Sequence, residues 1–322
     1  MKVGVIGVGS MGKNHARIYS GMEGVELVGV VDTDEKSGKA VAKSHGCRYY
    51  ENHEDFLEKE KPDAVSVCIP TSLHYAVAKD VIRHGVNLLV EKPITKNLGD
   101  AEQLVKLAGK AGVMLAVGHI ERFNPAVQEL KRLIDGGKLG EITSILSRRV
   151  GLFPPRIKDA NVIIDLAVHD IDVFNYLLGK EPAKIFSCAG KALINDREDY
   201  ADIFLKYDGT NGLIEVNWIT PVKIRILNVT GTKGYAELNY ITQDLTLYES
   251  VYEKTYDKFG DFVVQFGEPK KKLINIKKQE PLKLELENFI ESVKTGRQPL
   301  VTGMDGLKVL RIAVNIINSQ VK

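Results

Sequence analysis

The chain has 322 residues, of which 44% are hydrophobic and 27% charged, the ordinary balance of a globular protein long enough for two domains. Its 44 basic and 42 acidic residues give a formal net charge of +2, so no polycationic surface for nucleic acid is indicated. Cys47, Cys68 and Cys188 lie far apart without a CxxC pair, which argues against a disulfide framework or a zinc cluster and is typical of a reducing compartment.

The first residues, MKVGVIGVGSMG, contain an apolar run too short and too interrupted by glycine for a signal peptide. No later window approaches the roughly 18 uninterrupted apolar residues that a membrane span needs. We therefore expect a cytoplasmic protein that binds neither membrane nor nucleic acid.

The first 120 residues alternate short β-branched runs with helical patterns. Buried strands are predicted at Val3–Ile6, Val25–Val31, Ala64–Ile69, Asn87–Val90 and Met114–Val117. Helices are predicted between them at Lys13–Ser20, Lys36–His45, Leu73–His84 and Gly99–Ala111. This alternation predicts right-handed crossovers and a parallel sheet covered by helices on both faces.

Within the first of these strand-to-helix connections lies Gly7-Val8-Gly9-Ser10-Met11-Gly12. The first glycine permits the tight turn, the second lets a pyrophosphate approach the backbone, and the third allows close helix–strand packing. The helix N-terminus favours the phosphate charge. The segment, with Ser10 and Met11 in its loop, therefore predicts a bound dinucleotide, and a purely structural glycine turn is the alternative.

Asp32 follows Gly12 by twenty positions, at the end of the second predicted strand. Its carboxylate can accept hydrogen bonds from both adenosine ribose hydroxyls but would repel a 2′-phosphate. No arginine lies within Thr33–Lys39, although Lys36 and Lys39 carry positive charge. NAD is therefore favoured over NADP.

Two further stretches, CIPTSLHY at 68–75 and LLVEKPIT at 88–95, place polar residues just after strands of the parallel sheet. Ligands bind beyond the carboxyl ends of such strands. We therefore expect these side chains to border the cofactor: Pro70, Thr71, His74, Glu91 and Lys92. For Glu91-Lys92-Pro93, a plain surface turn is the alternative.

Residues 118–125, GHIERFNP, follow the last parallel strand and lead into a helix at Pro125–Leu133. His119, Arg122 and Asn124 are candidates to touch cofactor or substrate. The alternative is a hinge in which Arg122 forms a structural ion pair.

From about Glu141 the pattern changes to successive strands without intervening helices, which predicts an antiparallel sheet. The predicted strands are Thr143–Val150, Lys184–Leu193, Asp202–Tyr207, Leu213–Trp218 and Lys223–Val229. The lysine-rich segment 254–278 is weakly patterned and predicts an exposed excursion, and helices are predicted at Leu282–Thr295 and Asp305–Ile317.

The segment IIDLAVHDID, residues 163–172, places one histidine among three aspartates. In a helix, Asp165, His169 and Asp172 would share one polar stripe, and a carboxylate one turn away can fix the tautomer of an imidazole and raise its basicity. This predicts half of an acid–base site, with Asp170 off the stripe in a structural role. A helix histidine with a structural role only, or a metal site of the three stripe residues, are the alternatives.

In this order and at these intervals, Gly7–Gly12, Pro70-Thr71-x-x-His74, Glu91-Lys92-Pro93 and Asp165-x-x-x-His169 resemble the Gfo/Idh/MocA oxidoreductase family over essentially the whole chain. The resemblance implies an α/β protein: a Rossmann domain, then a C-terminal α/β domain with a large open, mostly antiparallel sheet. We place the Rossmann domain at 1–120 and the substrate and oligomerisation domain at 121–301, with the last helix, about 302–322, packing back on the first domain. The resemblance also implies a homo-oligomer, dimer or tetramer, formed through the open sheet, and a cis peptide before Pro93.

By position, the resemblance assigns catalytic roles to Lys92, His169 and Asp165. Oxidising a secondary alcohol requires removal of its hydroxyl proton as hydride leaves for the nicotinamide, and His169 can serve as that base. Lys92 can hydrogen-bond the same oxygen and keep His169 neutral by charge repulsion. Asp165, or in its place Asp172, would orient the imidazole, and no metal is expected because NAD accepts the hydride.

The segment RRVGLFPPRIKD, residues 148–159, brings four cations close before the catalytic helix: Arg148, Arg149, Arg156 and Lys158. The planar fork of arginine suits phosphate or carboxylate, so we expect Arg156 to bind substrate together with Arg122, Asn124, Asp165 and His169. A solvated charged face is the alternative.

This run resembles the nucleotide-sugar branch of the family, which oxidises C3 of UDP-N-acetylglucosamine to the 3-keto sugar. The corresponding uronate is an alternative substrate, and a free inositol or aldose is another. A non-catalytic dinucleotide-sensing regulator is the alternative from a different class, but that hypothesis predicts loss of Lys92 or His169, and both are present.

Overall fold

The computed structural model describes residues 1–153, 160–249, 252–256, 262–266 and 268–319. It divides into two compact units, Met1–Ile120 with Glu280–Val314, and Glu121–Gln279 with Asn315–Lys322. The expected extent of the second domain, 121–301, is therefore corrected at its end, because residues 280–301 belong to the first unit.

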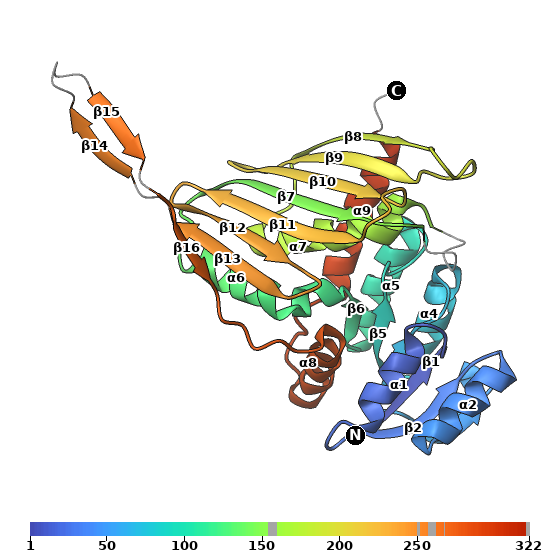
Figure 1. Ribbon diagram of the computed structural model, residues 1–322. Coiled ribbons are helices and arrows are strands. Elements are labelled where there is room, and N and C mark those ends of the chain that lie inside the picture. The colour runs from blue at the N-terminus through green and yellow to red at the C-terminus, as the bar shows by residue number, and fades with distance from the viewer. Residues whose placement is uncertain (154–159, 250–251, 257–261, 267, 320–322) are drawn as a thin grey trace. The chain divides into compact units, whose positions relative to one another are not determined.

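A six-stranded parallel sheet forms the centre of the first unit, in the order β3-β2-β1-β4-β5-β6 (Figure 1). Its strands are β1 (Lys2–Ile6), β2 (Glu26–Val31), β3 (Arg48–Tyr50), β4 (Ala64–Val67), β5 (Asn87–Glu91) and β6 (Leu115–Gly118). The predicted parallel sheet is confirmed; only β3, three residues long, is too short to show a periodicity. Since all six strands run the same way, their carboxyl ends share one edge.

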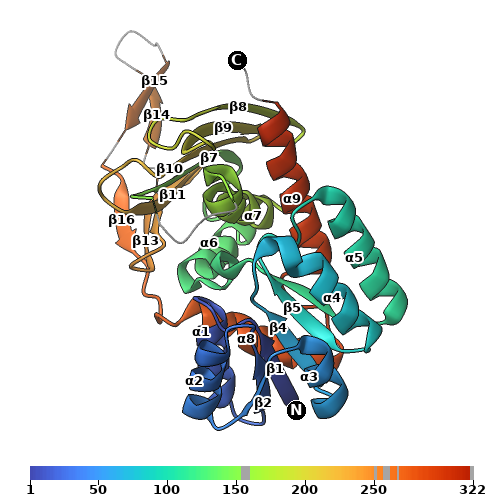
Figure 2. The same ribbon diagram turned by 90° about the vertical axis from the view of Figure 1, so that its right-hand side faces the viewer.

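Helices cover both faces of this sheet (Figure 2). On one face lie α1 (Gly12–Ser20), α2 (Glu35–His45) and α8 (Pro281–Thr295), and on the other α3 (His53–Glu60), α4 (His74–Arg83) and α5 (Leu98–Ala111). One buried cluster joins α1 and α8 to the sheet, with Tyr19, Leu286 and Phe289 packed against strand residues such as Val5. The cluster shows why α8 belongs to this unit: its apolar stripe completes the core.

The long helix α9 (Gly303–Asn318) begins against the edge strand β6. A Cβ at Gly303 would lie 2.7 Å from the Leu115 side chain, and one at Gly306 would lie 2.7 Å from that of Val117. Glycine at these two positions therefore lets the helix pack closely on the strand.

An eight-stranded sheet forms the second unit, in the order β16-β13-β12-β11-β7-β10-β9-β8. The strands are β7 (Ile142–Val150), β8 (Lys184–Gly190), β9 (Tyr200–Lys206), β10 (Asn211–Asn217), β11 (Ile224–Gly231), β12 (Gly234–Asn239), β13 (Asp244–Glu249) and β16 (Lys270–Leu273). All neighbours pair antiparallel except β7 and β10, which are parallel, so the predicted mostly antiparallel sheet is confirmed. The expected excursion at 254–278 instead contains β16 and parts of a separate hairpin, β14 (Tyr252–Tyr256) and β15 (Phe262–Phe266).

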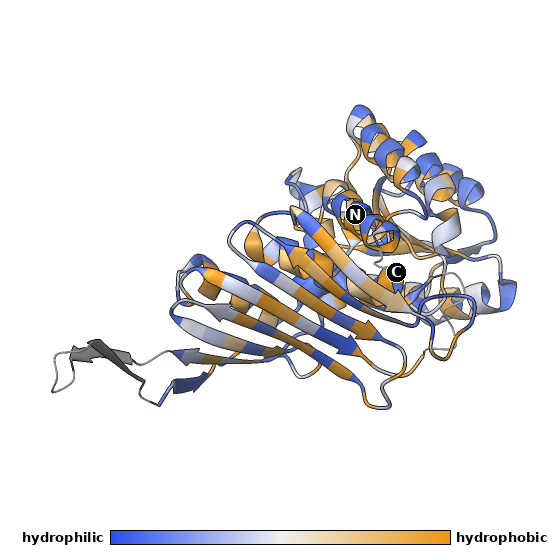
Figure 3. Cartoon of the chain, turned by 90° about the horizontal axis from the view of Figure 1, so that it is seen from above, coloured by the Kyte–Doolittle hydropathy of each residue, from blue (hydrophilic) through white to orange (hydrophobic). Residues whose placement is uncertain are grey.

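The two faces of the eight-stranded sheet differ. The helices α6 (Pro125–Asp135) and α7 (Val168–Leu178) cover one face, towards which residues such as Ile145, Leu227 and Val229 point and are fully buried. On the opposite face, Leu146, Phe186 and Leu213 keep 39–51% of their surface exposed. Hydrophobic and hydrophilic residues alternate along the strands (Figure 3), as a sheet with one covered face requires.

No helix in the described part of the chain is long and apolar enough to cross a membrane.

Candidate active site

The glycine loop after β1 has the steric features of a dinucleotide turn. Gly7 has φ +86°, and a Cβ there would lie 2.6 Å from the Cys68 carbonyl oxygen. A Cβ at Gly12 would lie 1.8 Å from the carbonyl oxygen of Gly7, whereas one at Gly9 would meet nothing within 4 Å. The first and third positions thus require glycine for packing, and the open side of Gly9 leaves room for a pyrophosphate.

Asp32 at the end of β2 is held against this loop. Its Oδ2 accepts a hydrogen bond from the Val8 N–H at 2.7 Å, and its Oδ1 accepts one from the Asp34 N–H at 2.9 Å. Lys39, one of the two nearby lysines, forms an ion pair with Glu35 on its own helix. A fixed carboxylate beside acidic neighbours fits ribose hydroxyls and opposes a 2′-phosphate.

The other predicted cofactor residues follow strands of the same sheet. Pro70 and Thr71 come after β4, where a short 3-10 turn spans Thr71–Leu73. Glu91 ends β5, and the Lys92-Pro93 peptide that follows it is cis. Because the strands are parallel, these residues share the carboxyl edge of the sheet with the glycine loop, Ser10 and Met11 included.

His74 does not have the predicted role of a cofactor contact. Its side chain is 1% exposed, and its ring nitrogens Nδ1 and Nε2 lie 2.9 Å from the carbonyl oxygens of Pro93 and Ile69. Burial lowers the pKa of this imidazole. Both ring nitrogens lie against backbone carbonyl oxygens, and the neutral imidazole can donate to one of them. His74 therefore ties the turn after β4 to the turn after β5, a structural role in place of the predicted cofactor contact.

His15, which is not among the residues predicted for the site, is fully buried on α1. Its Nε2 lies 3.1 Å from Oε1 of Glu91. Burial raises the pKa of Glu91, but the hydrogen bond and charge of His15, together with Lys92, outweigh burial and hold that pKa below its usual range. The signal in the sequence is the helical spacing of Gly12, His15 and Tyr19, which places the histidine on the buried face of the helix.

Asp165 and His169 lie in a distorted helical segment of the second unit. A π-helical turn over Ile163–Ala167 runs directly into α7, so the expected helix is present, but its first turn is π-helical. Both side chains are partly exposed, whereas Leu166, Ala167 and Val168 between them are buried. The two residues thus share the accessible side of the helix, and π turns occur frequently at functional sites.

Asp172, by contrast, is fully buried and bound to Arg122. The Arg122 Nε lies 2.8–2.9 Å from both carboxylate oxygens, and its Nη2 lies 2.6 Å from Oδ1. Asp172 therefore lies off the predicted stripe and can neither orient His169 nor complete a metal site with it. Arg122, 5% exposed and stacked on Tyr176, supports the fold rather than the substrate, so the prediction for it is corrected.

Asn124 is also a structural residue. Its Oδ1 accepts the Ala126 N–H at 3.1 Å and caps α6, and its Nδ2 donates to the Tyr240 carbonyl oxygen at 3.0 Å. The side chain is 1% exposed, and we correct its predicted role in substrate binding.

Two of the four cations of the predicted basic cluster, Arg148 and Arg149, lie in described residues, and each is paired with carboxylates. Arg149 is buried and bound to Asp170 at 2.7 Å and to Glu121 at 2.8 Å, which gives Asp170 its structural role. Arg148 pairs with Glu215, a residue of the open sheet face, at 2.8 Å. Arg156 and Lys158 lie outside the described residues.

A different arginine, Arg225 on β11, lies opposite Arg149 in the strand register. Its Nη1 donates to the carbonyl oxygens of Val150 and Ile224, and within the described part of the chain no carboxylate is hydrogen-bonded to it. Burial lowers the pKa of Arg225, repulsion from Arg149 lowers it further, and nearby carboxylates, among them Asp165, act in the opposite direction. The role of Arg225 could not be predicted from the sequence, because the residues beside it are set by the register between strands.

Comparison with known proteins identifies both parts of the chain. A family profile described as an oxidoreductase family with an NAD-binding Rossmann fold matches residues 1–119. The profile of the C-terminal alpha/beta domain of the same Gfo/Idh/MocA group matches residues 131–322.

Individual relatives span nearly the whole chain. UDP-N-acetylglucosamine 3-dehydrogenase of Acidithiobacillus ferrooxidans is 29% identical, over 98% of this chain and 96% of the relative. The NAD(+)-dependent scyllo-inositol 2-dehydrogenase of Bacillus subtilis is 28% identical, over 99% and 94%. A solved structure of the Acidithiobacillus ferrooxidans enzyme superposes with a TM-score of 0.86 at 28% identity, covering 99% of this chain and 97% of that one.

Proposed function

The chain belongs to the Gfo/Idh/MocA family of NAD-binding oxidoreductases, and we propose that it oxidises a secondary hydroxyl of a nucleotide sugar, namely C3 of UDP-N-acetylglucosamine. NAD, when bound, accepts the hydride that leaves this carbon. The substrate is supported by the Acidithiobacillus ferrooxidans relative of that activity.

The chain's own residues would accept the hydroxyl proton and stabilise the charge that develops on the reacting oxygen. We assign His169 as the base that takes the hydroxyl proton, and Asp165, one turn away on the same accessible side, as its orienting carboxylate. We assign Lys92 to hydrogen-bond the reacting oxygen. Asp32 and the glycine loop hold the adenosine end of NAD, and Pro70, Thr71 and Glu91 border the cofactor at the same sheet edge.

The single observation that favours an anionic substrate is Arg225. Arg122 and Arg149 on this side of the sheet are each neutralised by a buried carboxylate, whereas Arg225 donates to backbone oxygens. A half-buried cation of this kind gains most from a ligand that brings negative charge, such as a diphosphate. A free inositol offers no such charge.

The second candidate, an inositol dehydrogenase, is favoured by the almost equal identity of the Bacillus subtilis relative. The uronate of UDP-N-acetylglucosamine would satisfy Arg225 as well as its neutral parent does. These substrates are separated by assay rather than by further motifs.

The test is to follow reduced nicotinamide by absorbance with NAD and UDP-N-acetylglucosamine, its uronate, myo-inositol or glucose. We expect turnover of UDP-sugars, a kcat about 10²- to 10⁴-fold lower in His169→Ala, and a KM for the UDP-sugar about 10- to 100-fold higher in Arg225→Met. Arg132→Met, which removes an exposed cation of α6, is the matched control. Turnover of inositol or glucose alone would instead establish the second candidate, and turnover of none would favour a dinucleotide-sensing regulator.

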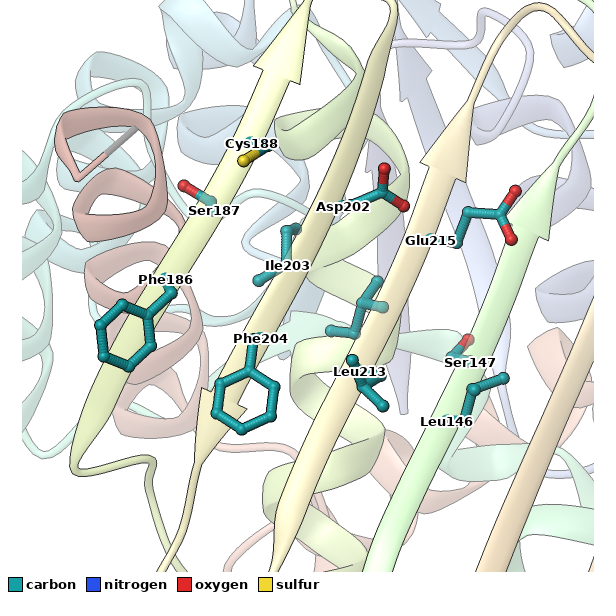
Figure 4. Close-up of a pocket in the computed structure, with 11 residues that line it drawn as sticks. Leu146, Ser147, Phe186, Ser187, Cys188, Asp202, Ile203, Phe204, Leu213 and Glu215 are labelled. Atoms are coloured by element: carbon teal, nitrogen blue, oxygen red, sulfur yellow. The ribbon is translucent and has the colours of Figure 1, made fainter. Parts of the chain in front are cut away.

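We also propose that a second copy of the chain packs on the open face of the eight-stranded sheet. A hollow of about 370 Å³ there is bordered by Leu146, Phe186, Phe204 and Leu213 (Figure 4). Contiguous apolar surface of this kind marks interaction sites. An open sheet face can form a self-complementary contact about a two-fold axis.

A further inference from the structure

A buried hydrogen bond joins the helix that follows the glycine loop to the end of β5. The His15 Nε2 lies 3.1 Å from Glu91 Oε1, and the His15 side chain is 0% exposed. The other oxygen of the same carboxylate, Oε2, accepts the backbone N–H of Lys92 at 3.3 Å. The Glu91 carboxylate thus bridges the imidazole and the backbone of the lysine.

The sheet is shaped to keep this carboxylate in place. Gly118 on β6 is the register partner of Glu91, and a Cβ there would lie only 3.0 Å from Oε2. Glycine at 118 therefore leaves the space that the Glu91 side chain occupies.

Cys68 is the third polar group of this cluster, since its Sγ and ligand atoms of His15 and Glu91 all lie within 4.8 Å of one another. Burial raises the pKa of the Cys68 thiol well above its usual value, and the Glu91 charge raises it further. The thiol therefore stays protonated, while His15 and Glu91 already bind each other. This donor set fits a hydrogen-bonded pair better than a metal site.

The far side of the same turn is fixed by His74, which contacts the Pro93 carbonyl oxygen at 2.9 Å. The segment 91–93 is consequently held by one histidine from α1 and one from α4. Of these two histidines, His15 stands on α1, the helix that begins at Gly12, the last residue of the glycine loop.

We propose that His15 is a positioning residue: it fixes Lys92 through Glu91 and links the dinucleotide loop to that lysine. Without the imidazole, a largely buried carboxylate loses its main partner and turns away to find water or another donor. The backbone of Lys92, hydrogen-bonded to the same carboxylate, moves with it. A displacement of about 1 Å at such a residue costs up to about 100-fold in rate.

The test compares His15→Leu, His15→Gln and Glu91→Gln, with His84→Gln at an exposed helix end as the control. Activity is measured with whichever of UDP-N-acetylglucosamine and myo-inositol the wild-type protein turns over, so the result does not depend on the sugar proposed above. We expect kcat to fall about 10- to 100-fold in His15→Leu, with the Kd for NAD changed less than about threefold. His15→Gln, which keeps a side-chain donor, should recover most of the activity.

Two further measurements separate positioning from simple loss of structure. The pair His15→Leu and Glu91→Gln should cost no more together than the larger single change, because both break one interaction. Hydrogen–deuterium exchange with NAD alone should show faster exchange confined to residues 91–97 in His15→Leu, and Glu91→Gln should show the same if the leucine variant fails to fold. Unchanged kcat, additive losses, or exchange raised evenly across the first unit would overturn the proposal.

Discussion

At the scale of single residues, pairing decides which charged side chains remain available for chemistry. Asp172 and Asp170 stand near His169 in the sequence, yet each is buried against its own arginine. Asp165 is the aspartate of this segment that keeps partial exposure. Residue type alone makes all three candidates, and burial distinguishes them.

Breaking the Arg122–Asp172 pair should therefore lower stability and leave substrate binding alone. We expect Asp172→Asn to reduce the free energy of unfolding by about 3–5 kcal/mol, because it leaves a buried guanidinium without its charge partner. Urea denaturation measures this loss. The double change Arg122→Met with Asp172→Leu should recover most of the lost stability. If Asp172→Asn instead raised KM and left stability unchanged, Arg122 would have a role in substrate binding.

The predictable part of the candidate site is the part encoded locally. The glycine loop and Asp32 could be predicted from spacing, because a turn and its strand are neighbours in the chain. The role of Glu91-Lys92 rests in addition on the family resemblance, since by position alone a surface turn is the alternative. His15 and Arg225 could not be predicted, since their partners are 76 residues away in one case and set by strand register in the other. The contacts of His74 are hidden from the sequence for a related reason: it shows a polar side chain after a strand, but not that both ring nitrogens lie against backbone carbonyl oxygens.

At the scale of elements, the π-helical turn carrying Asp165 is supported by the connection between β8 and β9. The Asn161 Oδ1 accepts the Ile164 N–H at 3.0 Å, and its Nδ2 donates to the Glu198 carboxylate at 2.9 Å. The Val162 N–H donates to the Glu198 carbonyl oxygen at 3.1 Å. Hydrophobic periodicity predicts a helix here, but it gives no sign of the π turn or of these contacts at its start.

That connection is itself held by Asp199, which is 1% exposed. Its carboxylate accepts the N–H groups of Ala192, Leu193 and Ile194 at 2.6–3.0 Å. Burial raises the pKa of Asp199, but these hydrogen bonds outweigh burial and hold it below its usual value. A carboxyl group with a depressed folded pKa stabilises the protein above its unfolded pKa, and that contribution is lost as pH falls through the folded value.

We expect Asp199→Asn to lower the free energy of unfolding by about 1–3 kcal/mol at pH 7, because an amide offers one acceptor where the carboxylate offers two. The difference from wild type should shrink only below about pH 4, the ordinary range of an aspartate. Denaturation curves at several pH values give both numbers. A gap between the two proteins that stays constant down to pH 2 would contradict the role assigned to the ionised carboxylate.

At the scale of the whole molecule, neither unit is a continuous segment. The first needs α8, since Leu282, Leu286, Phe289 and Ile290 belong to the same buried cluster as β1 and α1. The sequence predicts this helix but not its position in the fold. An apolar stripe shows that a helix is packed on one side, but it does not show which element it packs against. The two sheet types follow from the change of pattern near Glu141. The strands β12 and β13 alternate buried and more exposed residues, so the sequence carries their signal although neither is among the predicted strands. The exposed strand β16, with three lysines in four residues, carries no such signal.

The open sheet face gives the last prediction. The rings of Phe186 and Phe204 lie at a tilt with their centroids 6.1 Å apart, and Leu213 beside them is 41% exposed. If a second copy covers this face, the double change Phe186→Glu with Leu213→Glu should place charges in a contact from which water is excluded. We then expect sedimentation velocity to show monomers of this variant, and a dimer or larger assembly of the wild-type protein. Ile241→Glu, in a turn where the side chain is 52% exposed, should leave the assembly intact. The changed residues lie on the face opposite α7, so monomers that retain kcat would show that assembly is not required for the reaction. A wild-type protein that sediments as a monomer would refute the proposed contact.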